Sequence, residues 1–390
     1  MSRGTDVTDI KRNYRTKVEK DFPDNLIIEI EKESELRYGE NPNQPAAMFR
    51  LKLRAPEKNL AKITNIRLLK SGKGGLSATN YMDIASALNI LKYFEVPAVA
   101  VMKHLVPSGF ARQFNGSTLE EIYRRARDTD TRSSFGSVVV LNKPVDKSTA
   151  EAIMSSYVEV VAAPEFEEGT TKILERKKDI RCVLFSNIEK LPKFAGDDVS
   201  GFYDIKCLQT GRVLVQKPYL SSIRDSEDLI LDPFVEYEGV KHLVARDPTE
   251  RELEDLLTAW YVNLGVKSNG IVFVKEGATV AVGTGQQERV GAIEQAIIKA
   301  YQKAMDREKI KYDFVDGAAQ RESLSANPLE GAVMSSDAFL PFPDSINIIA
   351  RHGVTAVIQP GGSIRDHEVI DAVNNHGLAM AYTLERCFLH

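Results

Sequence analysis

The sequence predicts an α/β protein with two similar halves, and two observations lead to this prediction. Apolar runs of strand length, PAVAVMK (97–103) and GSVVVLN (136–142), alternate with helical patterns, which is typical of buried strands in layered α/β folds. In addition, PAVAVMKHLVPSG (97–109) and VTAVIQPGGS (354–363) are both apolar strands that run into a turn with proline and glycine. This similarity suggests duplicated domains, although one sequence leaves the duplication open.

Length and composition are those of an ordinary globular protein. The 390 residues leave room for two domains or three small ones, with 43% hydrophobic and 27% charged residues. A net charge of −4 favours neither a nucleic-acid partner nor a membrane surface. The polar N-terminus has no signal-peptide pattern, and no apolar run approaches the roughly 20 residues of a membrane span. We therefore expect a cytoplasmic protein.

The cysteines argue against two kinds of site. Cys182, Cys207 and Cys387 are isolated in the sequence and odd in number. This pattern fits neither a disulfide framework nor a thiolate zinc site.

The first half is expected to contain an N-terminal extension, residues 1–33, and a first domain, residues 34–216. Within it, Ser117 and Glu120 of STLE predict a reciprocal cap at the start of a helix. Residues 217–239 are irregular in pattern and are predicted to connect the two domains.

The second domain, residues 240–390, opens with the clearest helical signal of the chain. DPTE (247–250) offers an aspartate cap, a proline at the first helical position and a reciprocal glutamate. An apolar stripe follows at helical spacing, formed by Leu253, Leu256, Leu257, Trp260 and Leu264, and Gly265 is expected to end the helix. Next, GIVFVK (270–275) and TVAVG (279–283) predict a strand pair joined by EGA. The polar segment 299–328 is predicted to be a helical insertion.

Lys103 and His104 stand where the first of these strands ends. Val106 to Gly109 are predicted to turn the chain there, so that both side chains reach one site. Histidine is the natural general base near neutral pH, and a neighbouring lysine stabilises negative charge that develops on an oxygen. A strand-end lysine beside a packed histidine is an equally open interpretation.

Several other loops carry residues suited to a small anionic ligand, although each is also a common structural loop. Arg37 and Tyr38 precede a tight turn, and the guanidinium fork suits a phosphate monoester. SGKGGLS (71–77) does not fit the P-loop pattern. Ser363 is expected to cap a helix whose free N–H groups favour anions. Further candidates are Gly136, Asn269, Arg289, the aromatic loop SSDAFLPFPDS (335–345) and Arg386.

Some chemistries are excluded by missing motifs. The zinc-deaminase pattern of H-x-E with P-C-x-x-C is absent. H-E-x-x-H, G-x-S-x-G and G-x-G-x-x-G do not occur in matching contexts.

Eight motifs occur in an order that one protein family shares: LRYGENPNQ, KHLVPSG, RSSFG, VKSNGIVF, GTGQQERV, SSDAFLPF, PGGSIRDHEVI and LERCFLH. From about residue 34 to the C-terminus, the chain resembles the AICAR transformylase part of the bifunctional AICAR transformylase/IMP cyclohydrolase family. The resemblance implies two cytidine-deaminase-like α/β domains without the deaminase zinc, in a homodimer with sites near the subunit interface. It implies transfer of a formyl group from 10-formyltetrahydrofolate to the 5-amine of AICAR in purine biosynthesis.

The same resemblance assigns roles to individual residues. It implies that His104 is the general base and that Lys103 stabilises the transition state, and it implies no metal site. The family's AICAR-contacting positions correspond to Arg37, Tyr38, Asn80, His104, Gly136, Glu159, Lys178, Asn269, Arg289, Phe339 and Arg386. Its folate-contacting positions correspond to Val290, Asp344, Ser363 and Ile364. Arg37, Arg386 and Lys178 are expected to hold the 5′-phosphate.

The chain departs from the family pattern at three positions. Asn43 stands where histidine is usual, Val106 stands where asparagine is common, and Glu159 keeps a carboxylate where some members have aspartate. These departures concern contacts to the ribose and the base, not the reaction.

Two other functions remain open for this chain. One is a non-catalytic regulator that binds AICAR or folate, and the other is an enzyme that uses formate and ATP. A monovalent cation such as potassium is a candidate cofactor. Only about 33 residues precede the region of resemblance, and independent domains below about 40 residues usually need disulfides or metals. We therefore expect no cyclohydrolase activity and a separate IMP cyclohydrolase downstream.

Overall fold

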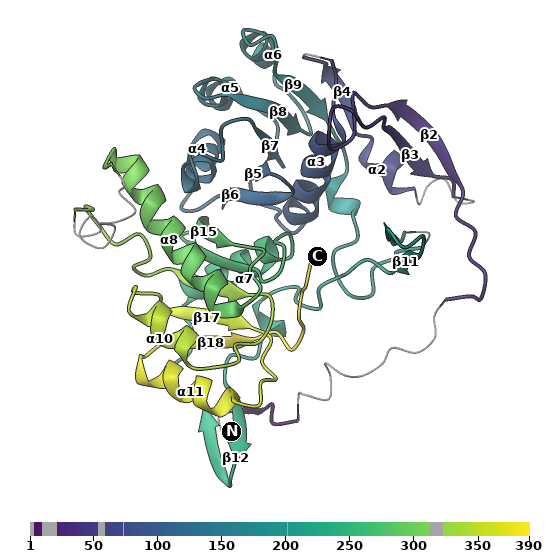
Figure 1. Ribbon diagram of the computed structural model, residues 1–390. Coiled ribbons are helices and arrows are strands. Elements are labelled where there is room, and N and C mark those ends of the chain that lie inside the picture. The colour runs from purple at the N-terminus through teal and green to yellow at the C-terminus, as the bar shows by residue number, and fades with distance from the viewer. Residues whose placement is uncertain (1–3, 10–21, 54–58, 73, 201, 312–322) are drawn as a thin grey trace.

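The computed structural model describes residues 4–9, 22–53, 59–72, 74–200, 202–311 and 323–390. Parts of the predicted N-terminal extension (10–21) and of the predicted insertion (312–322) lie outside the described residues. The described chain is built around an eleven-stranded mixed sheet of order β18-β17-β16-β14-β15-β6-β5-β7-β8-β9-β4 (Figure 1). The predicted α/β class is therefore confirmed.

The first half of the chain supplies one end of this sheet. β5 forms an antiparallel hairpin with β6 and pairs antiparallel with β7, while β7, β8 and β9 run parallel. The edge strand β4 (Arg67–Lys70) pairs antiparallel with β9. The elements follow in the order α3 (Ala78–Leu91), β5 (Ala98–Lys103), β6 (Val106–Arg112), α4 (Leu119–Thr129), β7 (Ser137–Leu141), α5 (Lys147–Met154), β8 (Val158–Ala163), α6 (Thr170–Leu174) and β9 (Arg181–Leu184).

The described part of the second half repeats this succession of helices and strands. β14 and β15 form the hairpin, β16 lies next to β14, and β16, β17 and β18 run parallel. The two halves meet where β15 pairs with β6, Ala278 opposite Ala111. The elements are α7 (Glu250–Asn263), β14 (Ile271–Lys275), β15 (Ala278–Gly283), α8 (Arg289–Glu308), β16 (Val333–Ser336), α10 (Asp344–Ala350), β17 (Ala356–Gln359), α11 (Asp366–Asn375) and β18 (Ala379–Tyr382).

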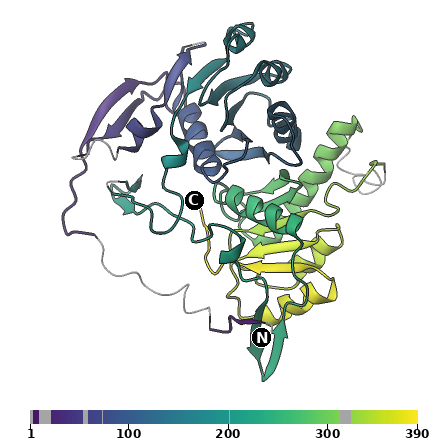
Figure 2. The same ribbon diagram turned by 180° about the vertical axis from the view of Figure 1, so that it is seen from behind.

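Smaller elements surround the large sheet. The β2–β3 and β10–β11 hairpins lie on one side of the molecule, and the β12–β13 hairpin projects at the end near the N-terminus (Figures 1 and 2). β1 runs parallel to β12. Their bounds are β1 (Thr5–Asp6), β2 (Ile30–Glu35), β3 (Ala47–Leu51), α2 (Leu60–Thr64), β10 (Asp204–Cys207), β11 (Val213–Gln216), β12 (Pro233–Tyr237) and β13 (Val240–Leu243), with short 3₁₀ turns at Ile188–Lys190 and Ser226–Asp228.

The two faces of the sheet are covered differently. On one face, α3 and α7 pack over a single core that contains residues of both halves, including Ile84, Phe110, Trp260 and Val272. On the other face, α4, α5 and α6 cover a core of the first half, and α8, α10 and α11 cover a separate core of the second half. Apolar burial on this scale is the main stabilising contribution to such a fold.

Two predicted helix starts are shifted along the sequence. Thr118 caps α4 with Glu121 as the reciprocal partner, not Ser117 with Glu120. Likewise, α7 begins after Thr249, which forms the capping box with Glu252, so the cap within DPTE is Thr249 and not the predicted Asp247. The hydroxyl that caps lies one residue after the predicted position in α4 and two residues after it in α7, and the backbone geometry selects it. The predicted apolar stripe of α7 is confirmed, since all its members are buried or partly buried against the shared core.

The predicted strand pair 270–275 and 279–283 is confirmed as β14 and β15, but its turn has two residues, Glu276 and Gly277, not three. The predicted insertion begins within α8, because residues 299–308 are the last turns of that helix. β12 occupies part of the predicted connection 217–239.

Candidate active site

Lys103 and His104 lie at the tip of the β5–β6 hairpin. Lys103 is the last residue of β5 and pairs with Val106, the first residue of β6. The turn is formed by His104 (φ 56°) and Leu105 (φ 70°), both in the left-handed region. The predicted turn at Val106 to Gly109 is therefore wrong, because these residues belong to β6. Two adjacent positive φ angles are the geometry of a type I′ hairpin turn.

A buried carboxylate holds this turn. Oδ1 of Asp83, on α3, accepts a hydrogen bond from the N–H of Leu105 at 2.7 Å. Burial raises the pKa of Asp83, and the hydrogen bond from Leu105 and the charges of His104 and Lys103 oppose that rise. Sequence reasoning missed Asp83, although its position in the helical stripe Asn80-Asp83-Ile84-Ala87 puts a carboxylate among buried positions.

The Lys103 side chain is fixed by two main-chain carbonyls. Its ammonium donates to the carbonyl oxygens of Phe135 at 2.9 Å and of Gly136 at 3.0 Å. Gly136 has φ 70°, and a Cβ added there would lie 3.2 Å from Nζ of Lys103 and 3.7 Å from Oε1 of Glu159. Glycine at this position therefore keeps space open between Lys103 and Glu159.

Asn80 joins this group from the start of α3. Its side chain forms the capping box with Ser77, and its Nδ2 donates to Oε2 of Glu159 at 3.4 Å. The structure thus brings together five of the predicted residues through direct contacts or a shared turn: Asn80, Lys103, His104, Gly136 and Glu159. We call these residues the His104 cluster.

Arg37 and Tyr38 lie against the same end of α3. The N–H of Arg37 donates to Leu76, and the carbonyl of Tyr38 accepts from the N–H of Ala78, next to the helix start. The Arg37 guanidinium lies 5.0 Å from the centre of the Tyr38 ring. The aliphatic part of the Arg37 side chain lies next to Gly74 of the glycine-rich loop. Arg37 therefore lies near the start of α3, from which Asn80 of the His104 cluster extends.

Lys178 has a weaker connection to this region. It is exposed, and its main-chain carbonyl accepts a hydrogen bond from the ammonium of Lys70 at 3.1 Å. Arg386 is also exposed, and its guanidinium lies 4.9 Å from the centre of the Phe388 ring.

The predicted residues of the second half form another group. Arg289 opens α8, and its guanidinium makes a buried ion pair with Asp337. Asp337 also accepts hydrogen bonds from the Ser268 hydroxyl at 2.6 Å and the Gly270 N–H at 2.8 Å. The Asn269 side chain donates to the carbonyl of Gln286 at 2.8 Å. Phe339, two residues after Asp337, is partly exposed.

The predicted folate positions lie on helix ends and loops of the second half. Val290 is partly buried in the first turn of α8, Asp344 is exposed at the start of α10, and Ile364 is 73% exposed. Ser363 does not cap α11, because that helix begins at Asp366 after Arg365. Instead, the Ser363 hydroxyl accepts from the Arg365 N–H at 3.1 Å, a local turn that competes with capping.

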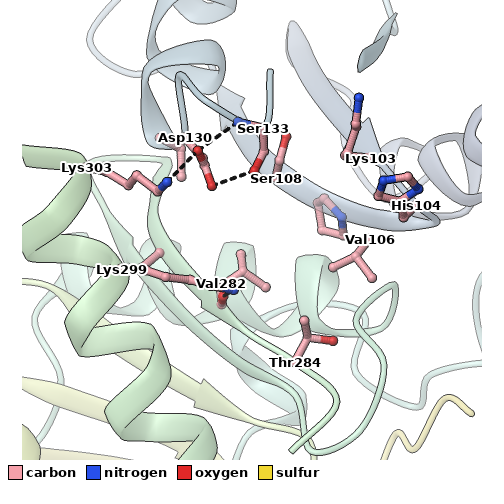
Figure 3. Close-up of a pocket in the computed structure, with 13 residues that line it drawn as sticks. Lys103, His104, Val106, Ser108, Asp130, Ser133, Val282, Thr284, Lys299 and Lys303 are labelled. Atoms are coloured by element: carbon pink, nitrogen blue, oxygen red, sulfur yellow. Dashed lines mark hydrogen bonds and ion pairs between the residues drawn. The ribbon is translucent and has the colours of Figure 1, made fainter. Parts of the chain in front are cut away.

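A cavity of about 250 Å³ opens beside the hairpin tip (Figure 3). Lys103 and His104 stand on one side of it, and Lys299 and Lys303 of α8 stand on the other. Lys303 pairs with Asp130 at 2.9 Å, and burial lowers the pKa of Lys299. Of the sequence candidates, only Lys103 and His104 line this cavity. Its other lining residues are Val106, Pro107, Ser108, Thr129, Asp130, Ser133, Ala281, Val282 and Thr284.

Thr284 links the cavity to the second-half group. It lines the cavity and its hydroxyl donates to the carbonyl of Lys267 at 2.9 Å, two residues before Asn269. Among the described residues, no group of three or more His, Cys, Asp or Glu side chains is arranged to hold a metal ion. Over the same residues, no helix has both the length and the apolar character that crossing a membrane requires.

Comparison with known proteins gives one family and a set of relatives. The model of the AICARFT/IMPCHase bienzyme family matches residues 7–299. The chain is 37% identical to the bifunctional purine biosynthesis protein PurH of Caldicellulosiruptor saccharolyticus over 372 residues, which is 95% of this chain and 62% of the relative. It is 38% identical to PurH of Magnetococcus marinus (95% and 62%) and 36% identical to PurH of Persephonella marina (97% and 63%). The chain thus spans less than two thirds of the length of these relatives.

Proposed function

The chain belongs to the AICARFT/IMPCHase bienzyme family, and from this we propose that it transfers a formyl group from 10-formyltetrahydrofolate to the 5-amine of AICAR. The observation that carries the proposal is the hairpin tip, where an exposed histidine follows a lysine whose ammonium is held by two carbonyls. A general base beside a fixed cation suits acyl transfer to a weakly nucleophilic amine.

His104 acts as the base in this proposal. The amine of AICAR is conjugated with a carboxamide-bearing imidazole, so it is a poor nucleophile and its proton has to leave as it attacks. The imidazole of His104 has no hydrogen-bond partner among the described residues and is free to take that proton. The amine nitrogen then bonds to the formyl carbon, the bond from that carbon to N10 of the folate breaks, and the proton passes to N10.

Lys103 stabilises the charge that develops on the formyl oxygen. An ammonium group has three N–H donors, and two of those on Lys103 bind the carbonyls of Phe135 and Gly136. One donor remains for the oxyanion, and it is already oriented because the other two fix the group. Such pre-oriented donors are a large source of transition-state stabilisation.

Binding of AICAR is assigned to the residues around this pair. Asn80, Glu159 and the open space at Gly136 border the reacting centre, while Arg37 is suited to the 5′-phosphate by its guanidinium fork. Asn269, Arg289, Phe339 and Arg386 are proposed as further AICAR contacts, with Lys178. Val290, Asp344, Ser363 and Ile364 are proposed for the folate.

The arrangement of the domains is also a proposal. We infer that residues 34–216 and 240–390 are two cytidine-deaminase-like domains, connected by residues 217–239, and the shared succession of helices and strands supports this.

A homodimer is supported by exposed apolar side chains on the small β10–β11 hairpin, namely Ile205, Leu208, Val213 and Leu214. Light scattering on the purified protein tests the dimer, and a monomer at micromolar concentration would contradict it.

The decisive experiment is an assay with AICAR and 10-formyltetrahydrofolate, with products separated by chromatography. We expect formylated AICAR and tetrahydrofolate, and we propose that these 390 residues do not close the ring to IMP. Product formed from formate and ATP instead of the folate would assign a different donor, and no product with either donor would contradict the function. Parallel reactions in sodium and potassium salts test the cation.

A further inference from the structure

Asp83 is a buried acid beside the proposed catalytic pair to which no role has been assigned. It lies on α3, one helical turn after Asn80, and is only 4% exposed. Its carboxylate binds the N–H of Leu105, the residue that follows His104. A charged group is rarely kept in such a position unless its neighbours compensate it.

The residues of the turn that Asp83 holds, histidine and leucine, do not favour the backbone conformation of that turn. Two-residue hairpin turns with positive φ at both positions prefer asparagine and glycine, whereas this turn contains histidine and leucine. Left-handed backbone is unfavourable for such side chains and persists only where the surrounding structure holds it. The hydrogen bond that Asp83 accepts from the N–H of Leu105 is the tertiary contact that does so, and the position of the His104 side chain depends on it.

The second half also contains a hairpin turn whose N–H groups bind a buried aspartate of the preceding helix. The β14–β15 turn also has two residues with positive φ, Glu276 and Gly277. Asp255 of α7 accepts hydrogen bonds from both of their N–H groups, at 2.8 Å and 2.7 Å. However, Asp255 is compensated by Arg251, at 3.1 Å, and by Arg112, whereas Asp83 faces the ammonium of Lys103 and the titratable imidazole of His104.

We propose that Asp83 is a positioning residue for formyl transfer, holding the hairpin turn that presents His104 and directing negative charge toward His104 and Lys103. This inference rests on the proposed function of the pair. The titratable and charged groups that face Asp83 are His104 and Lys103 on the hairpin and Glu159 on β8. A carboxylate in this place favours the imidazole in its proton-bearing form, which is the form that a general base reaches in the transition state.

Burial raises the pKa of Asp83, so the folded protein disfavours the charged carboxylate. The unfolded state carries no such penalty, and the cost is therefore present at pH values above the raised pKa and disappears in acid. Asp83→Asn removes this cost while it keeps an oxygen that accepts from Leu105. A residue that is retained for function at the expense of stability gives a specific pattern when it is replaced.

The first test compares Asp83→Asn with the unchanged protein at pH 8. We expect a melting temperature that is equal or higher, a kcat lower by about 10-fold, and a KM for AICAR changed by less than about 2-fold. The acid limb of the kcat/KM profile should move to lower pH, because the base loses its proton more easily without the negative charge. Unchanged kcat and an unchanged acid limb would overturn the proposal.

Two further variants separate the turn from the charge. Asp83→Ala removes both the acceptor and the charge, and we expect it to lose about 10-fold to 100-fold in kcat. Asp255→Asn is the matched control in the other hairpin, and it should keep kcat within about 2-fold even if it melts earlier. Equal losses of activity in Asp83→Asn and Asp255→Asn would show a general effect on folding and contradict a specific role.

A readout that does not need activity keeps this inference separate from the proposed function. NMR follows the imidazole resonances with pH, and the His104 signal is identified by its absence in His104→Ala. In Asp83→Asn its titration midpoint should fall by about half a pH unit or more. If the unchanged protein is inactive but the midpoint moves, the reaction is wrong and the coupling is right. An unmoved midpoint contradicts the coupling whatever the activity.

Discussion

His104 is an exposed residue in a backbone conformation that histidine seldom adopts, and this combination distinguishes it from a packed histidine. A core histidine would be buried and bonded, whereas His104 stands at the hairpin tip with Lys103 fixed beside it. At the scale of the residue, these observations favour a chemical role for His104 over a role in packing.

Replacement of His104 by alanine should lower kcat by about 10²-fold or more, which is the usual effect of losing a general base. The affinity for AICAR should stay within a few-fold, because most proposed contacts remain. Steady-state kinetics and calorimetry measure the two effects, with His376→Ala as the control at a histidine bonded to Asn347. Near-normal turnover in a folded His104→Ala protein would remove His104 from the mechanism.

Arg37 is predicted to recognise the phosphate of AICAR. Arg37→Ala should weaken AICAR binding by about 10-fold to 100-fold, the range of a lost charge-assisted hydrogen bond, and should affect the unphosphorylated riboside much less. Calorimetry with both ligands measures the difference. Arg124→Ala removes a surface arginine paired with Glu120 and serves as the control. Equal losses for both ligands would mean that Arg37 does not bind the phosphate.

At the scale of the element, two strands lack a side chain where a helix crosses them. A Cβ on Gly109 of β6 would collide with the carbonyl oxygen of Ala126 in α4, and a Cβ on Gly283 of β15 would collide with that of Ala292 in α8. Both halves thus use a strand glycine to let the helix after the hairpin pack closely.

Gly109→Ala should therefore destabilise the protein by about 2 kcal/mol or more, because main-chain atoms of α4 have to move. Gly291→Ala in α8 is the control with the opposite sign. The atoms nearest to its Cβ belong to the flexible Glu288 side chain, and alanine improves helix propensity by up to about 1 kcal/mol. Denaturant unfolding measures both, and equal stabilities of the two variants would contradict this account of the packing.

Glu252 is predicted to stabilise the start of α7 in a pH-dependent way. Burial alone would raise its pKa, but hydrogen bonds from Arg246, Thr355 and the N–H of Thr249 outweigh burial and lower the pKa to about 2. Because the pKa of Glu252 is lowered in the folded protein, its carboxylate stabilises the folded state at pH values above the unfolded pKa of 4.5. This stabilisation is lost as the pH falls toward 2.

Glu252→Gln should accordingly lower the free energy of unfolding by on the order of 3 kcal/mol at pH 7. The difference from the unchanged protein should shrink below about pH 4.5. Unfolding curves at pH 7 and pH 3 measure it, and a difference that is the same at both values would contradict the assignment.

Most of the helices and strands around the site are predictable from the sequence, and the features that were not predicted have physical causes. β5, β7, β14, β15 and α7 follow from buried apolar runs and a helical stripe. The helix caps were shifted because neighbouring residues compete for the same role. The turn at His104 was missed because it depends on Asp83, more than twenty residues earlier, and such tertiary hydrogen bonds leave no local pattern.

At the scale of the whole molecule, the two halves share one continuous core on the face covered by α3 and α7. The joint is reinforced by Thr279, whose hydroxyl donates to the carbonyl of Phe110 at 3.1 Å and accepts from its N–H at 2.8 Å. The sequence gives no sign of this joint, because it pairs residues that lie 169 positions apart.

The halves are therefore expected to unfold together. Trp260, the single tryptophan, reports on the second half by fluorescence, while far-ultraviolet circular dichroism reports on both. The two denaturant transitions should coincide. Thr279→Val should lower the free energy of unfolding by about 1 to 3 kcal/mol and move both transitions equally. Separate midpoints for the two probes would show that the halves are independent.

The pairing of β6 with β15 has one more consequence, which concerns sheet edges. In each half taken alone, this strand would be an outermost strand with a row of unsatisfied N–H and C=O groups. Inside the intact chain, each half conceals the open edge of the other. A fragment that ended between the halves would expose that edge to any extended strand it met, including a copy of itself. Covalent linkage of the halves thus protects these two strands against pairing with other chains, as well as joining the two groups of candidate site residues.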